Sequence, residues 1–371
     1  MPLYGFGSNS GSQLGLGFES DKEKSVEIHI EDLNYPIKNI YGGGNHCVIQ
    51  DIQNNYFISG CNKFGQLNYK EMGNIKNYFR FEKNKYWNEE GEKKECRIES
   101  ISLGFNHTII VKKNGEEDSN ESTVFLFGDN TYHQLGHKDK KIHYHQINFS
   151  QKIKSVYSGI KHSIILTEEG KIYGMGDNKY GQLLKNPKEN RFLIEITEIT
   201  EVKDIIDISL GLDHTVLLTK ENEIFIVGRN NKEQLANKEM KSSYKPIKLD
   251  LNIKVKEIHS GWFHNIIMDD ENNIYSFGSN QLGELAIGKK DNNNNNNNIL
   301  NKIELNNINK VSLGSNYNLY LLNNNELYTN GWNEHFNCID ENISIIYEPI
   351  LIYNNVIKFG NGYAFTIIYI K

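Results

Sequence analysis

The sequence has little cysteine, little proline and no long hydrophobic run. Its 371 residues include five prolines and four widely spaced cysteines, Cys47, Cys61, Cys96 and Cys338, with no Cys-x-x-Cys pair. Neither a zinc site nor a disulfide framework is therefore predicted. No apolar stretch approaches the roughly 18 residues of a membrane span, and no charged-then-apolar signal segment opens the chain. We expect a protein with reduced thiols in the cytoplasm, with the nucleus as a second compartment that the sequence leaves open.

Concentrated positive charge is also missing. The formal net charge is −6, with 41 Lys and Arg and 47 Asp and Glu spread along the chain. Proteins that bind nucleic acid directly usually carry a basic stripe or tail. We therefore expect no direct contact with nucleic acid.

Glycine and aromatic residues are plentiful, and they mark internal repeats. The chain has 31 Gly, 21 Tyr and 17 Phe, which favours a β-rich fold with many tight turns. The pattern G-x-N-x-x-x-Q-L starts at Gly7, Gly60, Gly128, Gly176 and Gly228, with weaker copies at Gly278 and Gly331. Successive copies are separated by 53, 68, 48, 52, 50 and 53 residues, a spacing typical of propeller blades.

A second motif alternates with the first. It reads G-x-x-H, followed by apolar residues, from Gly43, Gly104, Gly159, Gly211 and Gly261. Two further copies, from Gly314 and Gly360, carry Tyr317 and Tyr363 at the place that we assign to the histidine. Each repeat thus holds seven copies' worth of the same two signals in alternation.

Between the motifs, stretches such as "HSIILTEEGKIYGMGDN" predict a strand, a hairpin turn and a returning strand. The chain ends in the first half of a repeat and begins in the second half, so the two termini together complete one blade. Pairing the last strand with the first leaves no open sheet edge. We predict an all-β fold: a single seven-bladed β-propeller over residues 1–371.

These two alternating motifs resemble those of the regulator-of-chromosome-condensation (RCC1-like) family of seven-bladed propellers. The resemblance implies a fold that binds other proteins. In members that act as guanine nucleotide exchange factors for the small GTPase Ran, the ring of turns faces the GTPase, and acidic and histidine residues in it contribute to exchange. The matching candidates here are His46, His107, His162, Asp213, His214 and His264.

Two departures from the exchange-factor members bear on this implication. Those members carry a wedge inserted in one copy of the G-x-N-x-x-x-Q-L loop, whereas all seven copies here keep one spacing. The chromatin-binding member has a basic N-terminal tail, whereas this chain opens directly in a blade. Both exchange on Ran and nucleosome binding are weakened as predictions.

The repeated residues also have a purely structural interpretation, which we favour. The motif Asn and Gln would satisfy backbone groups of the turns, and the histidines would be hydrogen-bonded residues of the blade turns. Six motif leucines would pack between sheets: Leu14, Leu67, Leu135, Leu183, Leu235 and Leu285.

Three irregular segments distinguish this chain from a uniform array. The first, residues 69–96, is predicted as an insertion that binds a partner through its aromatic residues Tyr78, Phe79, Phe81, Tyr86 and Trp87. The second, residues 112–123, is an elongated hairpin. The third is an Asn-rich loop at 291–298, expected between the sixth and seventh repeats.

One further segment, "HQLGHKDKKIHYH", contains His133, His137, His143 and His145. It lacks paired Cys or carboxylate ligands, so we predict no metal site. No nucleophile elbow, phosphate-binding loop or dinucleotide fingerprint is present, and we predict no cofactor.

Taken together, these features predict a monomeric, non-enzymatic interaction scaffold. Its partner would be a regulatory protein such as a small GTPase, or a ubiquitin or trafficking component. The alternative is guanine nucleotide exchange on a Ran-like or other small GTPase through the G-x-x-H face, so enzymatic activity stays open.

Overall fold

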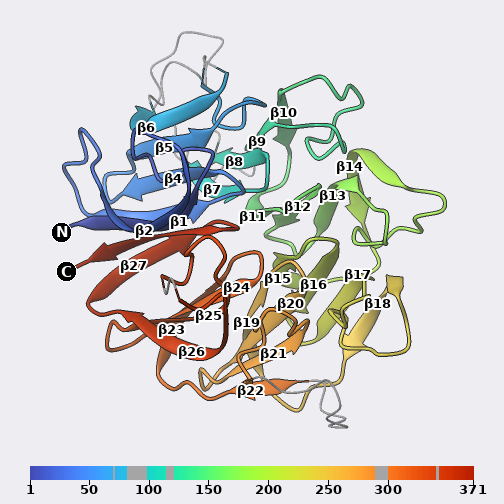
Figure 1. Cartoon of the computed structure of the whole chain (residues 1–371). Helices are drawn as coiled ribbons and strands as arrows, with labels where there is room; N and C mark the ends of the chain where they lie inside the picture. Colours follow the sequence, from blue (N-terminus) through green and yellow to red (C-terminus); the bar gives the residue numbers. More distant parts are fainter. Residues whose placement is uncertain (70–71, 82–97, 114–120, 289–299, 340–341) are drawn as a thin grey trace.

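Small antiparallel sheets surround a central axis in this protein (Figure 1). The computed structural model describes residues 1–69, 72–81, 98–113, 121–288, 300–339 and 342–371. Within these ranges the chain forms 28 strands in seven four-stranded sheets, and no helix. The predicted seven-bladed propeller is therefore confirmed. No helix in the described ranges has the length and hydropathy needed to cross a bilayer.

Each blade is numbered here from its inner strand, next to the axis, to its outer strand. Blade 1 contains β27 (Val356–Asn361), β28 (Phe365–Ile370), β1 (Leu3–Asn9) and β2 (Ser20–Ile28). Blade 2 contains β3 (Ile37–Gly42), β4 (His46–Asp51), β5 (Tyr56–Cys61) and β6 (Asn74–Phe81). Blade 3 contains β7 (Ile98–Leu103), β8 (His107–Lys113), β9 (Ser122–Gly128) and β10 (Tyr144–Phe149). Blade 4 contains β11 (Ile153–Ser158), β12 (His162–Thr167), β13 (Ile172–Asp177) and β14 (Phe192–Ile199).

The remaining three blades repeat this order. Blade 5 contains β15 (Ile205–Leu210), β16 (His214–Thr219), β17 (Ile224–Arg229) and β18 (Ser242–Leu249). Blade 6 contains β19 (Val255–Ser260), β20 (His264–Asp269), β21 (Ile274–Gly278) and β22 (Asn301–Ile303). Blade 7 contains β23 (Ile308–Leu313), β24 (Tyr317–Leu322), β25 (Leu327–Trp332) and β26 (Ile345–Tyr353).

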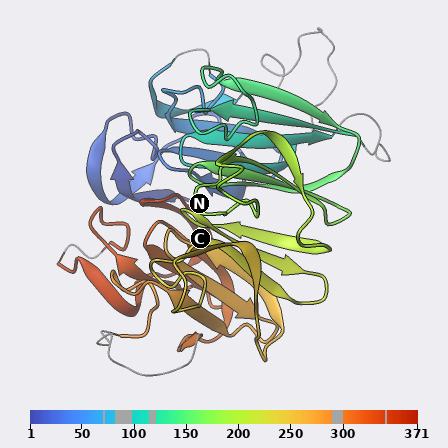
Figure 2. The same cartoon turned by 90° about the vertical axis from the view of Figure 1, so that its right-hand side faces the viewer.

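The ring closes through blade 1, which is built from both ends of the chain. Strand β1 pairs with β28, with Leu3 opposite Tyr369 and Gly7 opposite Phe365. Figures 1 and 2, which differ by a quarter turn, both place the termini next to each other. The inner strands contact one another in sequence around the whole ring, from β27 through β3 and back from β23 to β27. The predicted closure is thus confirmed.

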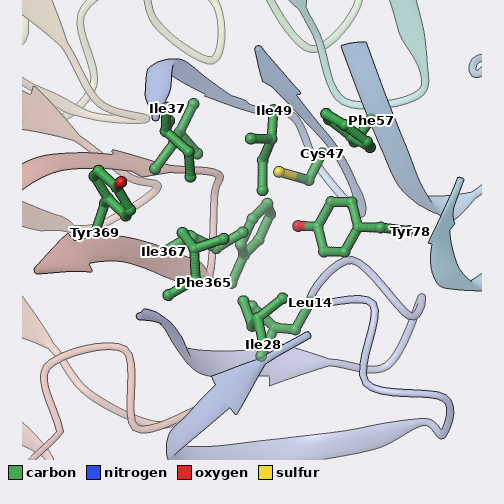
Figure 3. Packing of buried hydrophobic residues seen from close by; sticks show 12 residues of the cluster. Leu14, Ile28, Ile37, Cys47, Ile49, Phe57, Tyr78, Phe365, Ile367 and Tyr369 are labelled. Carbon is green, nitrogen blue, oxygen red and sulfur yellow. The ribbon is translucent and has the colours of Figure 1, made fainter. Parts of the chain in front are cut away.

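The hydrophobic core is divided among the interfaces between neighbouring blades. Figure 3 shows the cluster between blades 1 and 2, where Leu14 and Phe365 from one blade meet Cys47 and Tyr78 from the other. Equivalent clusters fill the other six interfaces. The second strand of most blades packs between two such clusters, so every residue of β4, β12, β16, β20 and β24 is buried. The six predicted motif leucines all lie in this core.

Gly60 shows why the first motif needs glycine. Its φ is +107°, and a Cβ there would lie 2.5 Å from the carbonyl oxygen of Asn45. A left-handed backbone at the end of the third strand and close approach to the G-x-x-H turn both exclude a side chain. The other six copies have the same positive φ, between +103° and +112°.

The three irregular segments are placed differently from the sequence prediction. Residues 74–81 form β6, the ordinary outer strand of blade 2, so the predicted 69–96 insertion is wrong for this part. The elongated hairpin falls between β8 and β9, and residues 114–120 lie outside the described ranges. The Asn-rich loop also lies outside them, but its flanking strands β21 and β22 belong to one blade, so it is not between repeats.

Candidate partner-binding face

Both sequence motifs lie on one face of the propeller. The histidine that starts each second strand pairs with the glycine that ends the third, as His46 does with Gly60 and His214 with Gly228. The amide of Cys61 then donates to the carbonyl of Asn45, 2.7 Å away. The G-x-x-H turn and the G-x-N-x-x-x-Q-L loop of a blade are therefore adjacent. We call the surface that carries all fourteen of these turns and loops the motif face.

The motif asparagines hold these loops closed. In blade 4, Asn178 Oδ1 accepts a hydrogen bond from the Leu183 amide at 2.9 Å. The same bond, from the motif asparagine to the amide five residues later, occurs in all seven copies. In five of them the Gln side chain also accepts from the amide two residues before it. The structural interpretation of the Asn and Gln residues is confirmed.

The five motif histidines lie beneath the motif face, because their side chains are completely buried. Each Nε2 reaches a polar side chain of the following blade, and the acceptor oxygens are those of Asn265 for His214 and Asn318 for His264. An amide oxygen only accepts, so these two rings carry their proton on Nε2. Burial lowers the pKa of all five imidazoles, to about 3 for His46 and His162 and to about 4 for the other three.

The prediction that His46, His107, His162, His214 and His264 contact a partner is therefore corrected. Neutral, buried rings tie neighbouring blades together and cannot reach a docked protein. The remaining motif copies do the same with other residues. Tyr317 donates its hydroxyl hydrogen to the carbonyl of Phe365 at 2.7 Å.

In blade 1 the histidine position belongs to Phe365, and not to Tyr363 as the sequence suggested. Phe365 starts β28, pairs with Gly7, and lies against Gly362 as the histidines lie against their own glycines. The spacing was counted from Gly360, two residues too early. Tyr363 occupies the position directly after the turn glycine.

Tyr363 takes part in an aromatic cluster on the axis. Its ring centroid lies 5.7 Å from that of Phe105 and 6.0 Å from that of Trp262. These residues come from blades 1, 3 and 6, which are not neighbours. Rings from such blades can meet only across the axis, so they fill the centre of the motif face.

Away from the axis, charged and aromatic side chains gather on the motif face of blades 3 to 5. Arg229 donates to Asp213 at 3.2 Å, and its guanidinium lies 4.9 Å from the centre of the Tyr180 ring. Asp213 is 6% exposed, whereas the Arg229 side chain is 29% exposed. Asp213 therefore fixes an arginine that remains accessible.

A second arginine repeats this arrangement one blade earlier. Arg191 forms an ion pair with the buried Asp177 and lies 4.4 Å from the centre of the Phe192 ring. Burial lowers the pKa of Arg191, and the nearby Asp213 and Tyr132 oppose that shift. Lys161 lies 4.8 Å from the centre of the Tyr132 ring.

These residues form one connected group, which we call the arginine–tyrosine cluster: Tyr132, Lys161, Asp177, Tyr180, Arg191, Asp213 and Arg229. Of these, the sequence prediction named only Asp213. The available signal was the variable position of the motif: blade 5 reads Gly-Arg-Asn where blades 3 and 4 read Gly-Asp-Asn.

The predicted aromatic partner loop is only partly on the surface. Tyr78 and Phe81 belong to β6 and are buried in the core, so their predicted role as exposed anchors is wrong. Phe79 points outward, is 46% exposed and stacks on Tyr69 with 5.7 Å between ring centroids. Tyr86 and Trp87 lie outside the described residues.

The histidine-rich segment serves the backbone. The Nδ1 atoms of His133, His143 and His145 contact the carbonyl oxygens of His137, Gly128 and Leu135. In the described part of the chain, no group of three or more His, Cys, Asp or Glu residues is placed to hold a metal ion.

Comparison with known proteins now identifies the family. The model of the RCC1-like domain matches residues 2–368, so the chain belongs to the RCC1-like domain family. It is 25% identical to the mouse secretion-regulating guanine nucleotide exchange factor, over 94% of this chain and 77% of that protein.

Two further relatives differ in size and in the kind of similarity. The chain is 31% identical to the rat probable E3 ubiquitin-protein ligase HERC4, over 53% of this chain and 19% of that protein. The crystal structure of Prp20p from Saccharomyces cerevisiae, studied for its binding to Gsp1p and histones, superposes with a TM-score of 0.83 at 21% identity, covering 99% of this chain and 90% of that chain. This last similarity shows the fold alone.

Proposed function

We propose that this propeller is a non-enzymatic interaction platform that binds a small GTPase through the arginine–tyrosine cluster of its motif face. The observation that carries this proposal is the pair Asp213–Arg229 beneath and beside Tyr180. Arginine and tyrosine are the residues most often found at the energetic centre of protein interfaces. Here buried carboxylates hold them in place before a partner arrives, which reduces the entropy lost on binding.

Two relatives support a GTPase as the partner. The mouse protein, similar over nearly the whole chain, is named as an exchange factor. Prp20p, which has the same fold, is described as binding Gsp1p. The similarity to HERC4 covers about half of this chain, so a partner in ubiquitin transfer receives less support.

Guanine nucleotide exchange is the second candidate, favoured by the name of the mouse relative. Against it stands the geometry of the loops. Every G-x-N-x-x-x-Q-L loop is closed at the same length by its asparagine bond, which leaves none of them as an inserted wedge. Binding without exchange is therefore the function that we place first.

A panel of purified small GTPases, Ran included, tests the proposal. Affinities for the nucleotide-free, GDP-bound and GTP-bound forms are measured for the wild type and for Arg229→Ala/Tyr180→Ala. Removing two such anchors should weaken binding about 30-fold or more, since each costs on the order of 1–2 kcal/mol or more at an interface. The matched control is Lys254→Ala, a 74% exposed side chain on another connection of blade 6, which should leave affinity unchanged.

Release of fluorescent GDP separates the two candidates. A platform binds the GTPase without accelerating release, whereas an exchange factor accelerates release and binds the nucleotide-free form most tightly. If no GTPase binds, or if the double variant binds as well as wild type, the proposal is wrong. Cytoplasmic residence belongs to the same proposal, and a fluorescent fusion in cells tests it.

A further inference from the structure

The histidine-rich segment borders a surface that the proposed function does not use. Beyond His133, this segment runs along the outer rim as the connection into β10, and it carries Lys138, Lys140 and Lys141. Strand β10 of blade 3 and strand β14 of blade 4 lie beside each other on this rim (Figure 1).

Two depressions there form one groove. The first, of about 410 Å³, lies between the two strands and is lined by residues of the connection, by Ile147 of β10 and by Ile196 of β14. The second, of about 420 Å³, lies against β14 and is lined by Lys185, Asn190 and Phe192, among others. Lys138 and Glu195 line both, so the depressions are continuous. We call them together the rim groove.

The outer edge of β14 runs along this groove. Among the described residues, β14 pairs only with β13, on its inner side. The register jumps from Gly174 opposite Thr197 to Gly176 opposite Leu193, so residues 194–196 bulge away from the ladder. Ile194 in this bulge is 45% exposed. An open strand edge beside an apolar floor is the geometry to which extended peptides add as a further strand.

The charge around the groove is positive, although the whole chain carries −6. Glu195 is the one carboxylate among the residues that line it. Lys185 is paired with Glu201 at 2.8 Å. In contrast, Lys138 and Lys140 make no ion pair with any described residue, and Lys140 extends over the Phe192 ring at 5.1 Å from its centre.

The histidines keep this connection in shape. His145 Nδ1 lies 2.7 Å from the Leu135 carbonyl oxygen, and its ring packs edge-on against His137 with 5.1 Å between centroids. The Asp139 amide donates to His137 Nδ1 at 3.1 Å. These bonds fix the backbone on both sides of Lys138, so the lysines stand at defined positions beside the groove.

We propose that the rim groove binds an extended acidic peptide of a partner protein, added as a strand along β14. Its carboxylates pair with Lys138 and Lys140, and an aliphatic side chain sits on Ile147 and Ile196. This site shares no lysine with the motif face, and the proposal is independent of the proposed GTPase.

Fluorescence anisotropy with labelled ten-residue peptides tests it on the full chain. The probe alternates Glu and Val. Three comparison peptides replace Glu by Lys, replace Glu by Gln, or place Pro at alternate positions, which removes the N–H groups that a strand needs. The protein variants are Lys138→Glu/Lys140→Glu and, as a matched control, Lys238→Glu/Lys241→Glu on the equivalent connection of blade 5.

The Glu–Val peptide should bind, and the Pro peptide and the Lys peptide should not. The Lys138→Glu/Lys140→Glu variant should bind at least about tenfold more weakly, since two exposed ion pairs are lost and reversed, while the control variant should match wild type. Equal binding of the acidic and basic peptides, or equal losses in both variants, would overturn the proposal. So would a dimer in sedimentation equilibrium that Lys138→Glu/Lys140→Glu abolishes, because a second copy would then occupy the groove.

Discussion

Replacing Asn178 by alanine measures how much one motif loop contributes to the fold. The Asn178 side chain is fully buried and makes three hydrogen bonds. Its Oδ1 accepts from the Leu183 amide at 2.9 Å, and its Nδ2 donates to the carbonyls of Lys185 and Asn190, both at 2.8 Å. No other group in the loop replaces these contacts, so the alanine variant leaves buried backbone groups unpaired.

The magnitude follows from those three bonds. A buried hydrogen bond contributes on the order of 1 kcal/mol net, and an amide left unpaired inside the protein costs about 1–3 kcal/mol. Asn178→Ala should therefore lower the free energy of unfolding by about 3–5 kcal/mol. Urea denaturation followed by tryptophan fluorescence measures it, with the slope against urea unchanged.

Asn186→Ala is the matched control, because this asparagine in the same blade makes only solvent-exposed side-chain bonds. It should cost less than about 1 kcal/mol. If Asn178→Ala costs no more than Asn186→Ala, the motif asparagines do not hold the loops, and the structural account of the repeat fails.

Three further predictions concern stability and reactivity. The five buried histidines stay neutral when folded, with pKa values lowered to about 3–4, but bind protons at about pH 6.5 once unfolded; stability should be complete above pH 6.5 and fall as the pH drops toward 4, and unfolding at pH 5 should take up about four to five more protons, read from the pH dependence of the urea midpoint. Gly60→Ala should destabilise the protein by more than about 2 kcal/mol because its Cβ meets the Asn45 backbone, whereas Gly73→Ala, with a similar φ and open space around it, should cost less in the same assay. Burial raises the pKa of Cys47 and Cys338 to about 12, so mass spectrometry after treatment with a thiol reagent at pH 8 should find both unmodified until urea unfolds the chain.

The sequence predicted the number of blades and their closure because every blade solves the same packing problem. A left-handed glycine, an asparagine that closes the loop and a buried leucine must recur at fixed spacing, as Gly60, Asn62 and Leu67 do in blade 2. Such local requirements can be read directly from the order of residues.

The candidate site could be predicted only in part, because its contacts join different repeats. Arg229 lies over Tyr180, and Arg191 is close to Asp213, through the relative placement of blades 4 and 5. No spacing within one repeat encodes these pairs. The histidines were misplaced on the surface for a related reason: their partners, such as Asn265 for His214, are about 50 residues away in the next blade.

The aromatic residues of β6 show a third limit. Tyr78 and Phe81 were assigned to an insertion because the interval between motifs is long. The alternation of β6, in which Ile75, Tyr78 and Phe81 are buried between exposed residues, was the signal that marked a strand. The bulge that interrupts outer strands breaks the simple period of two and hides it.

Hydrogen exchange of the propeller, alone and mixed with the GTPase that it binds most tightly, tests the central claim directly. The account predicts slower exchange in the motif-face segments 176–183 and 228–235, next to Asp177, Tyr180 and Arg229, with no change in β14 on the rim. Protection confined to the rim or to the opposite face, with these two segments unchanged, would contradict the assignment of the motif face as the binding surface.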